Sequence, residues 1–217
     1  DEKGQGTFLA SVAAGRENIQ EGITGAASEA EIAVVKLKEA KDYLRKFYGI
    51  RQMAGCYQET DVMQGLRYLH LLALKKQKPL VMCVALGTNL GGHNGMSSLS
   101  RILGSYSRLV DRCVVIGGGN EANERHHFQG KLNQVGEVQE VEMRVESGNT
   151  GFVAELWGTI PNIVTAYLIS PSGERSPVIS IRQGNRYQLT FPFEQTVVDV
   201  EYRLLLRDGR SQLLFLK

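Results

Sequence analysis

The chain has 217 residues, of which 42% are hydrophobic and 22% charged, and its formal net charge is +2. The length allows one large domain or two small ones, and the composition is ordinary for a globular protein. A small net charge with scattered lysines and arginines argues against a nucleic-acid surface, which needs a concentrated basic stripe. No apolar run reaches the ~18 residues of a membrane span. We therefore expect neither nucleic acid nor a membrane as a partner.

The first element is the stretch DEKGQGTFLASVAAG, residues 1–15. A glycine-flanked Gln-Gly-Thr followed by small apolar residues is typical of a catalytic loop that enters a helix. Gln5 stands between the two glycines, where such a loop would carry its catalytic side chain. Its amide cannot take up a proton at neutral pH. The pattern alone leaves open whether this is an enzyme without its base or no enzyme at all. Because the chain begins inside the motif, we expect further sequence upstream.

The next elements alternate between strands and helices. A strand is predicted at 31–37, and a helix at 61–76, where apolar residues recur at helical spacing. The continuous apolar run at 79–87 is typical of a strand buried on both faces, and 113–120 is a similar run that ends in glycines. Between them, a second helix is predicted to begin at the serines 97–98. This alternation implies a parallel sheet with right-handed crossovers.

The cysteines number three and lack CxxC spacing: Cys56, Cys83 and Cys113. Two of them lie in the apolar strand-like runs. The sequence therefore predicts buried free thiols and no disulfide framework.

From about residue 138 the chain becomes rich in short β-type runs. Breaks between them carry Gly, Pro, Asn or Asp in most cases, and no helical stretch occurs. Seven strand candidates of this kind predict an antiparallel sandwich or jelly roll. The last run stops at Lys217 without a terminating turn, so we expect this domain to be cut off there. The predicted organisation is an α/β domain over 1–137 and a β domain over 138–217.

The glycine run GGGNEA, residues 117–122, formally satisfies the GxGxxA pattern of a dinucleotide-binding loop. That fingerprint requires the glycines to begin a helix whose N-terminus meets the pyrophosphate. The residues that follow, NERHHFQG, offer no apolar face with which a helix could pack on a sheet. We therefore expect no nucleotide and no other cofactor.

Loop histidines raise the possibility of a metal site. His126 and His127 lie near Glu121 and Glu124, but adjacent histidines point in different directions and no zinc-ligand spacing is present. We predict that both are surface or locally hydrogen-bonded residues, and that His93 has a structural role. No metal is expected.

Several motifs, in order along the chain, carry a resemblance to the subtilisin-like serine peptidases, or subtilases. GQGTFLASVAAG (4–15) resembles the histidine motif, usually Gly-His-Gly-Thr-x-Val-Ala-Gly, and GITGAASEAEIAVVKL (22–37) is similar to the stretch before the core strand. VALG (84–87) resembles the Ser-Leu-Gly segment that pairs with the substrate. GGGNEAN (117–123) resembles the Ala-Ala-Gly-Asn-Glu segment, whose Asn donates to the oxyanion. Their order and spacing make the match more specific than any single motif.

Four further stretches, 34–50, 61–69, 86–95 and 119–130, resemble the Csp-type germination proteases of clostridia. That group is known for a jelly-roll domain inserted after the oxyanion segment and before the serine, and the β-rich segment 138–217 fits it. The resemblance covers nearly the whole chain, as a fragment. It implies that the Asp motif precedes residue 1 and that the Gly-Thr-Ser-Met-Ala motif follows residue 217.

Position by position, the resemblance places Gln5 at the position of the general base and Asn120 at that of the oxyanion donor. The implied substrate-cleft residues come from the two glycine-bounded segments: Ala85, Leu86, Gly87, Gly117, Gly118 and Gly119. Ala85 stands where the family usually has Ser, which leaves backbone pairing with a peptide possible. Gln5 stands where the family has His, which removes the base.

In the mechanism of these enzymes, the imidazole takes the serine proton and later returns it to the leaving amine. A reference pKa near 6.5 makes both transfers feasible at neutral pH, whereas glutamine has no comparable basic atom. In subtilisin, loss of the base lowers turnover by about 2 × 10⁶, which corresponds to roughly 8–9 kcal/mol of barrier. The resemblance therefore implies a pseudoprotease.

The same resemblance implies a role in spore germination and a bacterial-spore location. It also implies partners: a peptide or protein segment that resembles a substrate, the protein's own prodomain, or an active paralogous protease. Two alternatives remain open. The protein is an active subtilase in which position 5 was altered, or a jelly-roll ligand-binding module on a subtilase scaffold.

Overall fold

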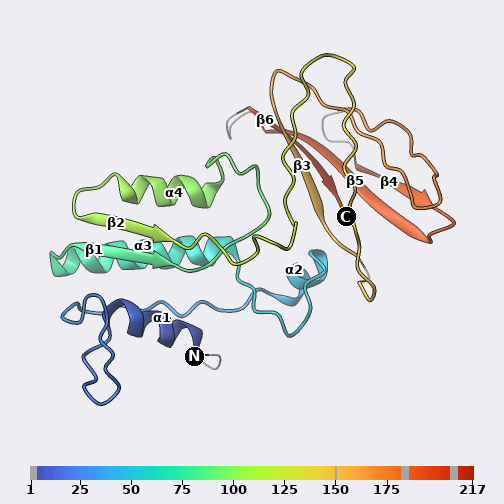
Figure 1. Ribbon diagram of the computed structural model, residues 1–217. Helices are drawn as coiled ribbons and strands as arrows, with labels where there is room; N and C mark the ends of the chain where they lie inside the picture. The colour runs from blue at the N-terminus through green and yellow to red at the C-terminus, as the bar shows by residue number, and fades with distance from the viewer. Residues whose placement is uncertain (1–3, 150, 182–185, 206–209) are drawn as a thin grey trace.

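A computed structural model describes residues 4–149, 151–181, 186–205 and 210–217. Its elements follow in the order α1 (Gln5–Ala14), α2 (Asp42–Phe47), α3 (Glu59–Lys76), β1 (Leu80–Val84), α4 (Ser98–Ser107), β2 (Arg112–Ile116), β3 (Ala154–Thr159), β4 (Arg186–Phe191), β5 (Thr196–Leu205) and β6 (Ser211–Leu216). The strands form a two-stranded parallel sheet and a four-stranded antiparallel sheet, which lie in separate parts of the molecule (Figure 1). The predicted combination of a parallel α/β part and an antiparallel β part is confirmed.

The parallel sheet is covered on one face by α3 and α4. Met82 and Val84 of β1 pack against Leu66 of α3 and Leu103 of α4, and all four side chains are buried. The helix α4 begins where predicted, because the side chain of Ser97 accepts a hydrogen bond from the backbone N–H of Ser100. Both helix predictions and the parallel pairing of β1 with β2 are confirmed.

The other face of this sheet is uncovered among the described residues. Alternation along a strand places Val81, Cys83, Cys113 and Val115 on this face. The side chains of Val81 and Val115 are 66% and 50% exposed, and both cysteines are exposed. The cysteines are free, as predicted, but the prediction that they are buried is wrong. The prediction that 79–87 is buried on both faces is also wrong, because hydrophobicity alone does not show whether another element covers each face of a strand.

The strand predicted at 31–37 is absent from this structure. The segment is extended but pairs with no described strand, and a strand needs a neighbour with which to share backbone hydrogen bonds. It is nevertheless fixed to α3, because a Cβ built on Gly65 would lie 3.1 Å from Cγ1 of Val35. At its start, the carboxylate of Glu31 pairs with Lys76 at the end of α3 and with Lys78 just after it.

The antiparallel sheet has the strand order β3-β6-β5-β4. One of its faces carries the second core of the molecule, which contains Ile179, Leu189, Val200, Tyr202, Leu214 and Leu216. Not all of the predicted strands form. Residues 138–149 contain no regular strand, and the region from 163 to 181 contributes only isolated bridges such as Ala166 to Ile179. The domain boundary near 137 stays a prediction.

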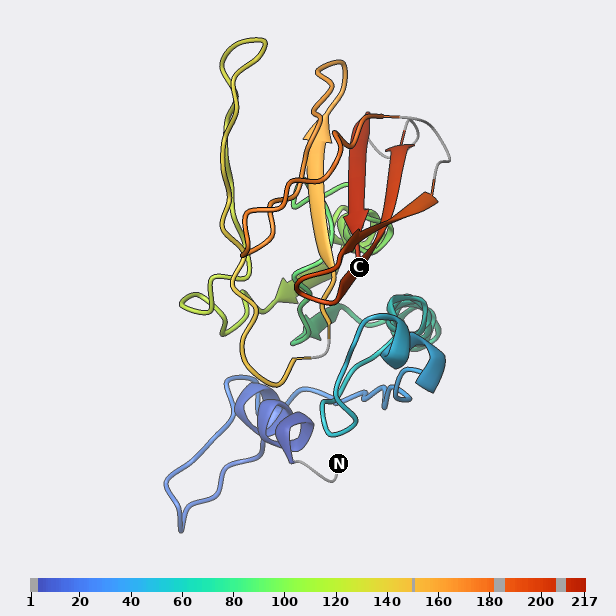
Figure 2. The same cartoon turned by 90° about the vertical axis from the view of Figure 1, so that its right-hand side faces the viewer.

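The two parts of the molecule meet through α2 and the segment that follows β1. Both contact the face of the antiparallel sheet that lies opposite the second core. The ring of Phe47 stacks on that of Phe215 with centroids 5.9 Å apart, and the Lys217 ammonium lies 4.3 Å from the centroid of Phe47. In Figure 2 the antiparallel sheet stands above the part of the chain that contains α1 and α2. Within the described ranges, no helix is both long and apolar enough to span a membrane.

Candidate functional site

Two loop segments meet where the parallel strands end. The backbone N–H of Gly117 donates to the carbonyl oxygen of Val84 at 3.1 Å, directly after the last paired residues of β1 and β2. A Cβ built on Gly117 would lie 3.9 Å from Cα of Ala85. The predicted cleft segments 85–87 and 117–119 therefore start side by side, at the edge where parallel sheets form their sites.

The segment 85–87 is open and its backbone is unpaired in this structure. Ala85 and Gly87 are exposed, and Leu86 is 39% exposed. No hydrogen bond joins the backbone of these residues to any other described residue. Free backbone N–H and C=O groups of this kind can accept a peptide as an added strand.

The neighbouring segment 117–120 is also open. Gly118 and Gly119 have no atom within 4 Å of a built Cβ, and Asn120 is exposed at the end of the segment. The backbone of Gly119 has φ +83°, a left-handed conformation that favours glycine. No helix follows these glycines, as the residues after them predict.

Gln5 is the first residue of α1 and is exposed, so the predicted loop-to-helix transition is confirmed. Backbone hydrogen bonds tie α1 to the following loop, from the N–H of Ala26 to Val12 and from that of Ala27 to Ala13. Among the described residues, no Cα of another helix or strand lies within 8 Å of a Cα of α1. The N-terminal end of α1 lies on the side to which β1 and β2 point (Figure 1). No described contact joins Gln5 to Asn120.

A polar cluster links the loop after β1 to the loop after β2. The Nδ2 of Asn89 donates to Oε2 of Glu121 at 2.5 Å, and Nδ1 of His126 lies 3.0 Å from the same oxygen. The rings of His93 and His127 lie side by side with centroids 4.6 Å apart. Hydrogen bonds from His126 and then Asn89 lower the pKa of Glu121. The cluster therefore holds the two loops together beside Asn120.

These contacts agree with the prediction that His126 is locally hydrogen-bonded on the surface. The described residues contain no group of three or more His, Cys, Asp and Glu side chains that is arranged to hold a metal ion.

The loop after β1 also contacts the antiparallel sheet, which the sequence did not predict. Glu155 of β3 accepts two hydrogen bonds at its Oε2, from the backbone N–H of Gly91 and from Nε1 of Trp157, each at 2.8 Å. Gly92 lies against the indole, since a built Cβ would be 3.1 Å from Cε3 of Trp157. Glu155 and Gly91 are 64 residues apart, so no local sequence signal could have indicated this contact.

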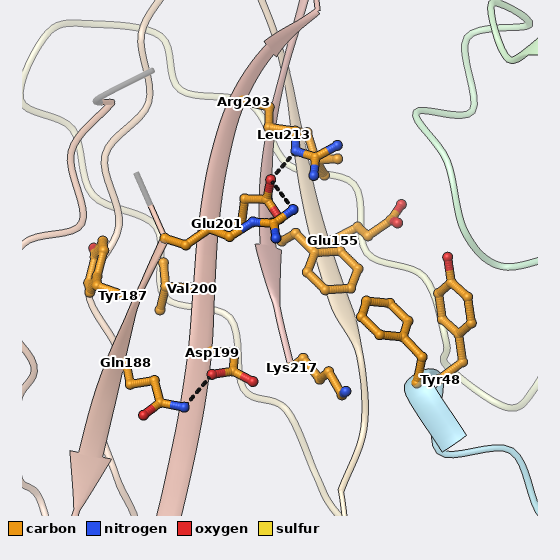
Figure 3. A pocket seen from close by; sticks show the side chains of 13 residues that line it. Tyr48, Glu155, Tyr187, Gln188, Asp199, Val200, Glu201, Arg203, Leu213 and Lys217 are labelled. Atoms are coloured by element: carbon orange, nitrogen blue, oxygen red, sulfur yellow. Dashed lines mark hydrogen bonds and ion pairs between the residues drawn. The ribbon is translucent and has the colours of Figure 1, made fainter. Parts of the chain in front are cut away.

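A concavity of about 540 Å³ lies between α2 and the outer face of the antiparallel sheet (Figure 3). Most of its charged side chains have partners: Glu201 pairs with Arg186 and Arg203, and Nε2 of Gln188 donates to Asp199 at 2.7 Å. Burial would raise the pKa of Glu201, but the two arginines outweigh it and lower the value. The concavity is thus mainly an internally paired contact zone between the two parts of the molecule.

No family model matches the chain, and no curated protein matches it. Among solved structures, the chain is similar to the structure of the Clostridium perfringens CspB protease, with a TM-score of 0.73 and 22% sequence identity. The alignment covers 96% of this chain and 41% of that protease, so the chain spans less than half of the protease's length. The resemblance to the Csp-type subtilases is therefore confirmed at the level of the fold, over nearly the whole of this chain.

Proposed function

We propose that this chain belongs to a Csp-type subtilase homologue that holds a peptide or protein segment in its cleft and cleaves it poorly or not at all. The observation that carries the proposal is the open, unpaired backbone at 85–87, which lies beside the glycine segment that leads to Asn120. The chemical argument adds Gln5, which stands where the resembling motif has its histidine.

An extended peptide fits this edge better than a compact ligand does. Backbone groups at 85–87 can bond to a peptide whatever its sequence, and side-chain pockets then supply specificity. The side chain at 85 is only a methyl group, so it leaves those backbone groups accessible. Asn120 can donate its amide to a peptide carbonyl, which gives the cleft a polar contact that needs no proton transfer.

Gln5 argues against efficient cleavage. A serine nucleophile needs a base that takes its proton and returns it, and an amide side chain has no atom of suitable pKa. Loss of the base in subtilisin lowers turnover by about 2 × 10⁶, while substrate binding and the oxyanion donor still provide a residual rate. The expected protein binds a substrate-like segment and processes it very slowly.

The fold likeness to a CspB protease supports a role in spore germination, with an active paralogous protease or the protein's own prodomain as the bound partner. On this proposal the antiparallel part is the family's inserted jelly roll. A ligand-binding role for that part has less support, because Glu201, Arg186 and Arg203 in the concavity beside it already pair with one another.

The test uses the full-length protein and two probes, fluorescein-labelled casein for cleavage and a fluorescein-labelled Ala-Ala-Pro-Phe amide for binding. We expect peptide binding without measurable casein hydrolysis, and hydrolysis in the Gln5→His variant if the Asp and Ser positions are filled. Hydrolysis by the unaltered protein at a rate typical of subtilases would contradict the loss of function. Absence of binding to every extended peptide tried would contradict the cleft.

A further inference from the structure

The loop at 88–95 is held from two sides. On one side, Asn89 bonds to Glu121 and the ring of His93 lies beside that of His127, which ties the loop to the segment after Asn120. On the other side, the loop touches the antiparallel sheet through Gly91, Gly92 and Asn94. The loop thus contacts both the segment that follows Asn120 and the antiparallel sheet.

The contact with the sheet is specific. Glu155 gives one carboxylate oxygen, Oε2, to both the N–H of Gly91 and the indole N–H of Trp157. Trp157 in turn fills the space over Gly92, where even a methyl group would approach its ring to 3.1 Å. Nδ2 of Asn94 adds a longer hydrogen bond, 3.4 Å, to Oγ of Ser211.

The loop begins directly after the open edge at 85–87. Because those residues have no described backbone partner of their own, their direction depends on β1 before them and on the loop after them. A shift of the loop at Gly91 would therefore change the direction of the N–H and C=O groups at 85–87. A misplacement of about 1 Å, even far from the chemistry, can lower catalysis by about 10²-fold.

We propose that Glu155 and Trp157 are positioning residues for the cleft: they fix the 88–95 loop and so set the peptide-binding edge at 85–87. The inference rests on the proposed function for its ligand, an extended peptide. It assigns the antiparallel sheet a task beyond packing, because the sheet determines how well the other part of the molecule binds. By linkage, a peptide bound in the cleft also strengthens the contact between Glu155 and the loop.

A merely structural Glu155 would behave differently from a positioning one. Its removal would lower stability and leave the loop and the peptide affinity unchanged in the folded molecules. The Glu155→Gln variant separates the effects of charge and geometry, because its one carbonyl oxygen can still accept both N–H groups. The Glu155→Ala variant removes the acceptor altogether.

The experiment measures two quantities on the full-length protein, hydrogen–deuterium exchange of peptides covering 88–95 and the Kd of the labelled Ala-Ala-Pro-Phe amide. For Glu155→Ala we expect exchange at the loop to rise about tenfold and the Kd to rise about five- to tenfold, at the lower end of typical coupling between sites. For Glu155→Gln, both the exchange rate at the loop and the Kd should stay within about twofold of those of the unaltered protein. Phe193→Ala serves as the control, since Phe193 is 84% exposed in the turn between β4 and β5 and lies outside this contact.

Gly92→Ala tests the contact from the loop side and leaves the sheet intact, in case Glu155→Ala fails to fold. Its new methyl group should push the loop from Trp157 and raise both exchange and Kd. Unchanged exchange in both variants would overturn the proposal, and so would raised exchange with an unchanged Kd. If the unaltered protein binds no peptide, the proposed function fails and the positioning role fails with it, while the exchange data still show whether Glu155 holds the loop.

Discussion

Val35 lies directly over Gly65 of α3, with its Cγ1 3.1 Å from the position that a Cβ on Gly65 would occupy. The extended segment around Val35 has no described strand partner, so this contact with α3 is a main reason for its placement. A glycine in the middle of a helix normally lowers stability by about 1 kcal/mol relative to alanine. Here the missing side chain makes room for the valine.

Gly65→Leu should therefore lower the free energy of unfolding by about 1–3 kcal/mol, the usual cost of overfilling a packed contact. The matched control is Gly104→Ala in α4, where nothing lies within 4 Å of the new Cβ. That change should raise stability by up to about 1 kcal/mol. Urea unfolding of the two variants measures both changes. An unchanged free energy of unfolding in Gly65→Leu would mean that the segment at Val35 moves aside freely.

Met82 and Val81 are neighbours in β1 that face opposite sides of the sheet. Met82 is 1% exposed and packs in the first core, whereas Val81 is 66% exposed. Met82→Ala should lower the free energy of unfolding by about 2–5 kcal/mol, and Val81→Ala by much less. Equal costs in the chain 1–217 would show that the second face of the sheet is covered after all.

Glu31 should titrate far below an ordinary glutamate. Hydrogen bonds from Lys76 and then Lys78, with their charges, lower its pKa from 4.5 to about 2. Because the folded pKa is depressed, the contribution of Glu31 to stability is present above about pH 4.5 and is lost as the pH falls towards 2. In an NMR titration, Lys76→Met should move the pKa of Glu31 upward, towards 4.5. An unmoved pKa would show that the pair does not persist in solution.

Tyr202 is 2% exposed, and its hydroxyl lies 2.6 Å from both Oε1 of Gln212 and the carbonyl oxygen of Val164. Tyr202→Phe should lower the free energy of unfolding by about 1–3 kcal/mol, because the one O–H that reaches Oε1 of Gln212 and the carbonyl oxygen of Val164 is lost. Tyr68→Phe, at a tyrosine that is 56% exposed, is the control and should be nearly neutral. Thermal or urea unfolding measures the stability of both variants. Equally small effects would show that the hydrogen bond between Tyr202 and Gln212 contributes little.

The sequence predicts best those features that depend on neighbouring residues. The apolar spacing of α3, the serine cap at Ser97 and the order of the glycine motifs are all local, and the structure has each of them. The prediction of a strand at 31–37 fails because strand formation depends on a partner strand. The bond between Glu155 and Gly91 was missed for a related reason, since only the tertiary fold brings β3 to the loop after β1.

The glycines of the site allow the cleft to be closed without damage to the fold. Gly118 is exposed, has nothing within 4 Å of a built Cβ, and its φ is outside the left-handed range. In Gly118→Val, a branched side chain would occupy the space in front of the 85–87 edge, where the proposed peptide lies. We expect the Kd for the labelled peptide amide to rise at least about tenfold, equivalent to about 1.4 kcal/mol, with unchanged unfolding. Gly104→Ala, remote from the site, should bind like the unaltered protein. Full peptide affinity in a folded Gly118→Val variant would mean that the peptide lies elsewhere.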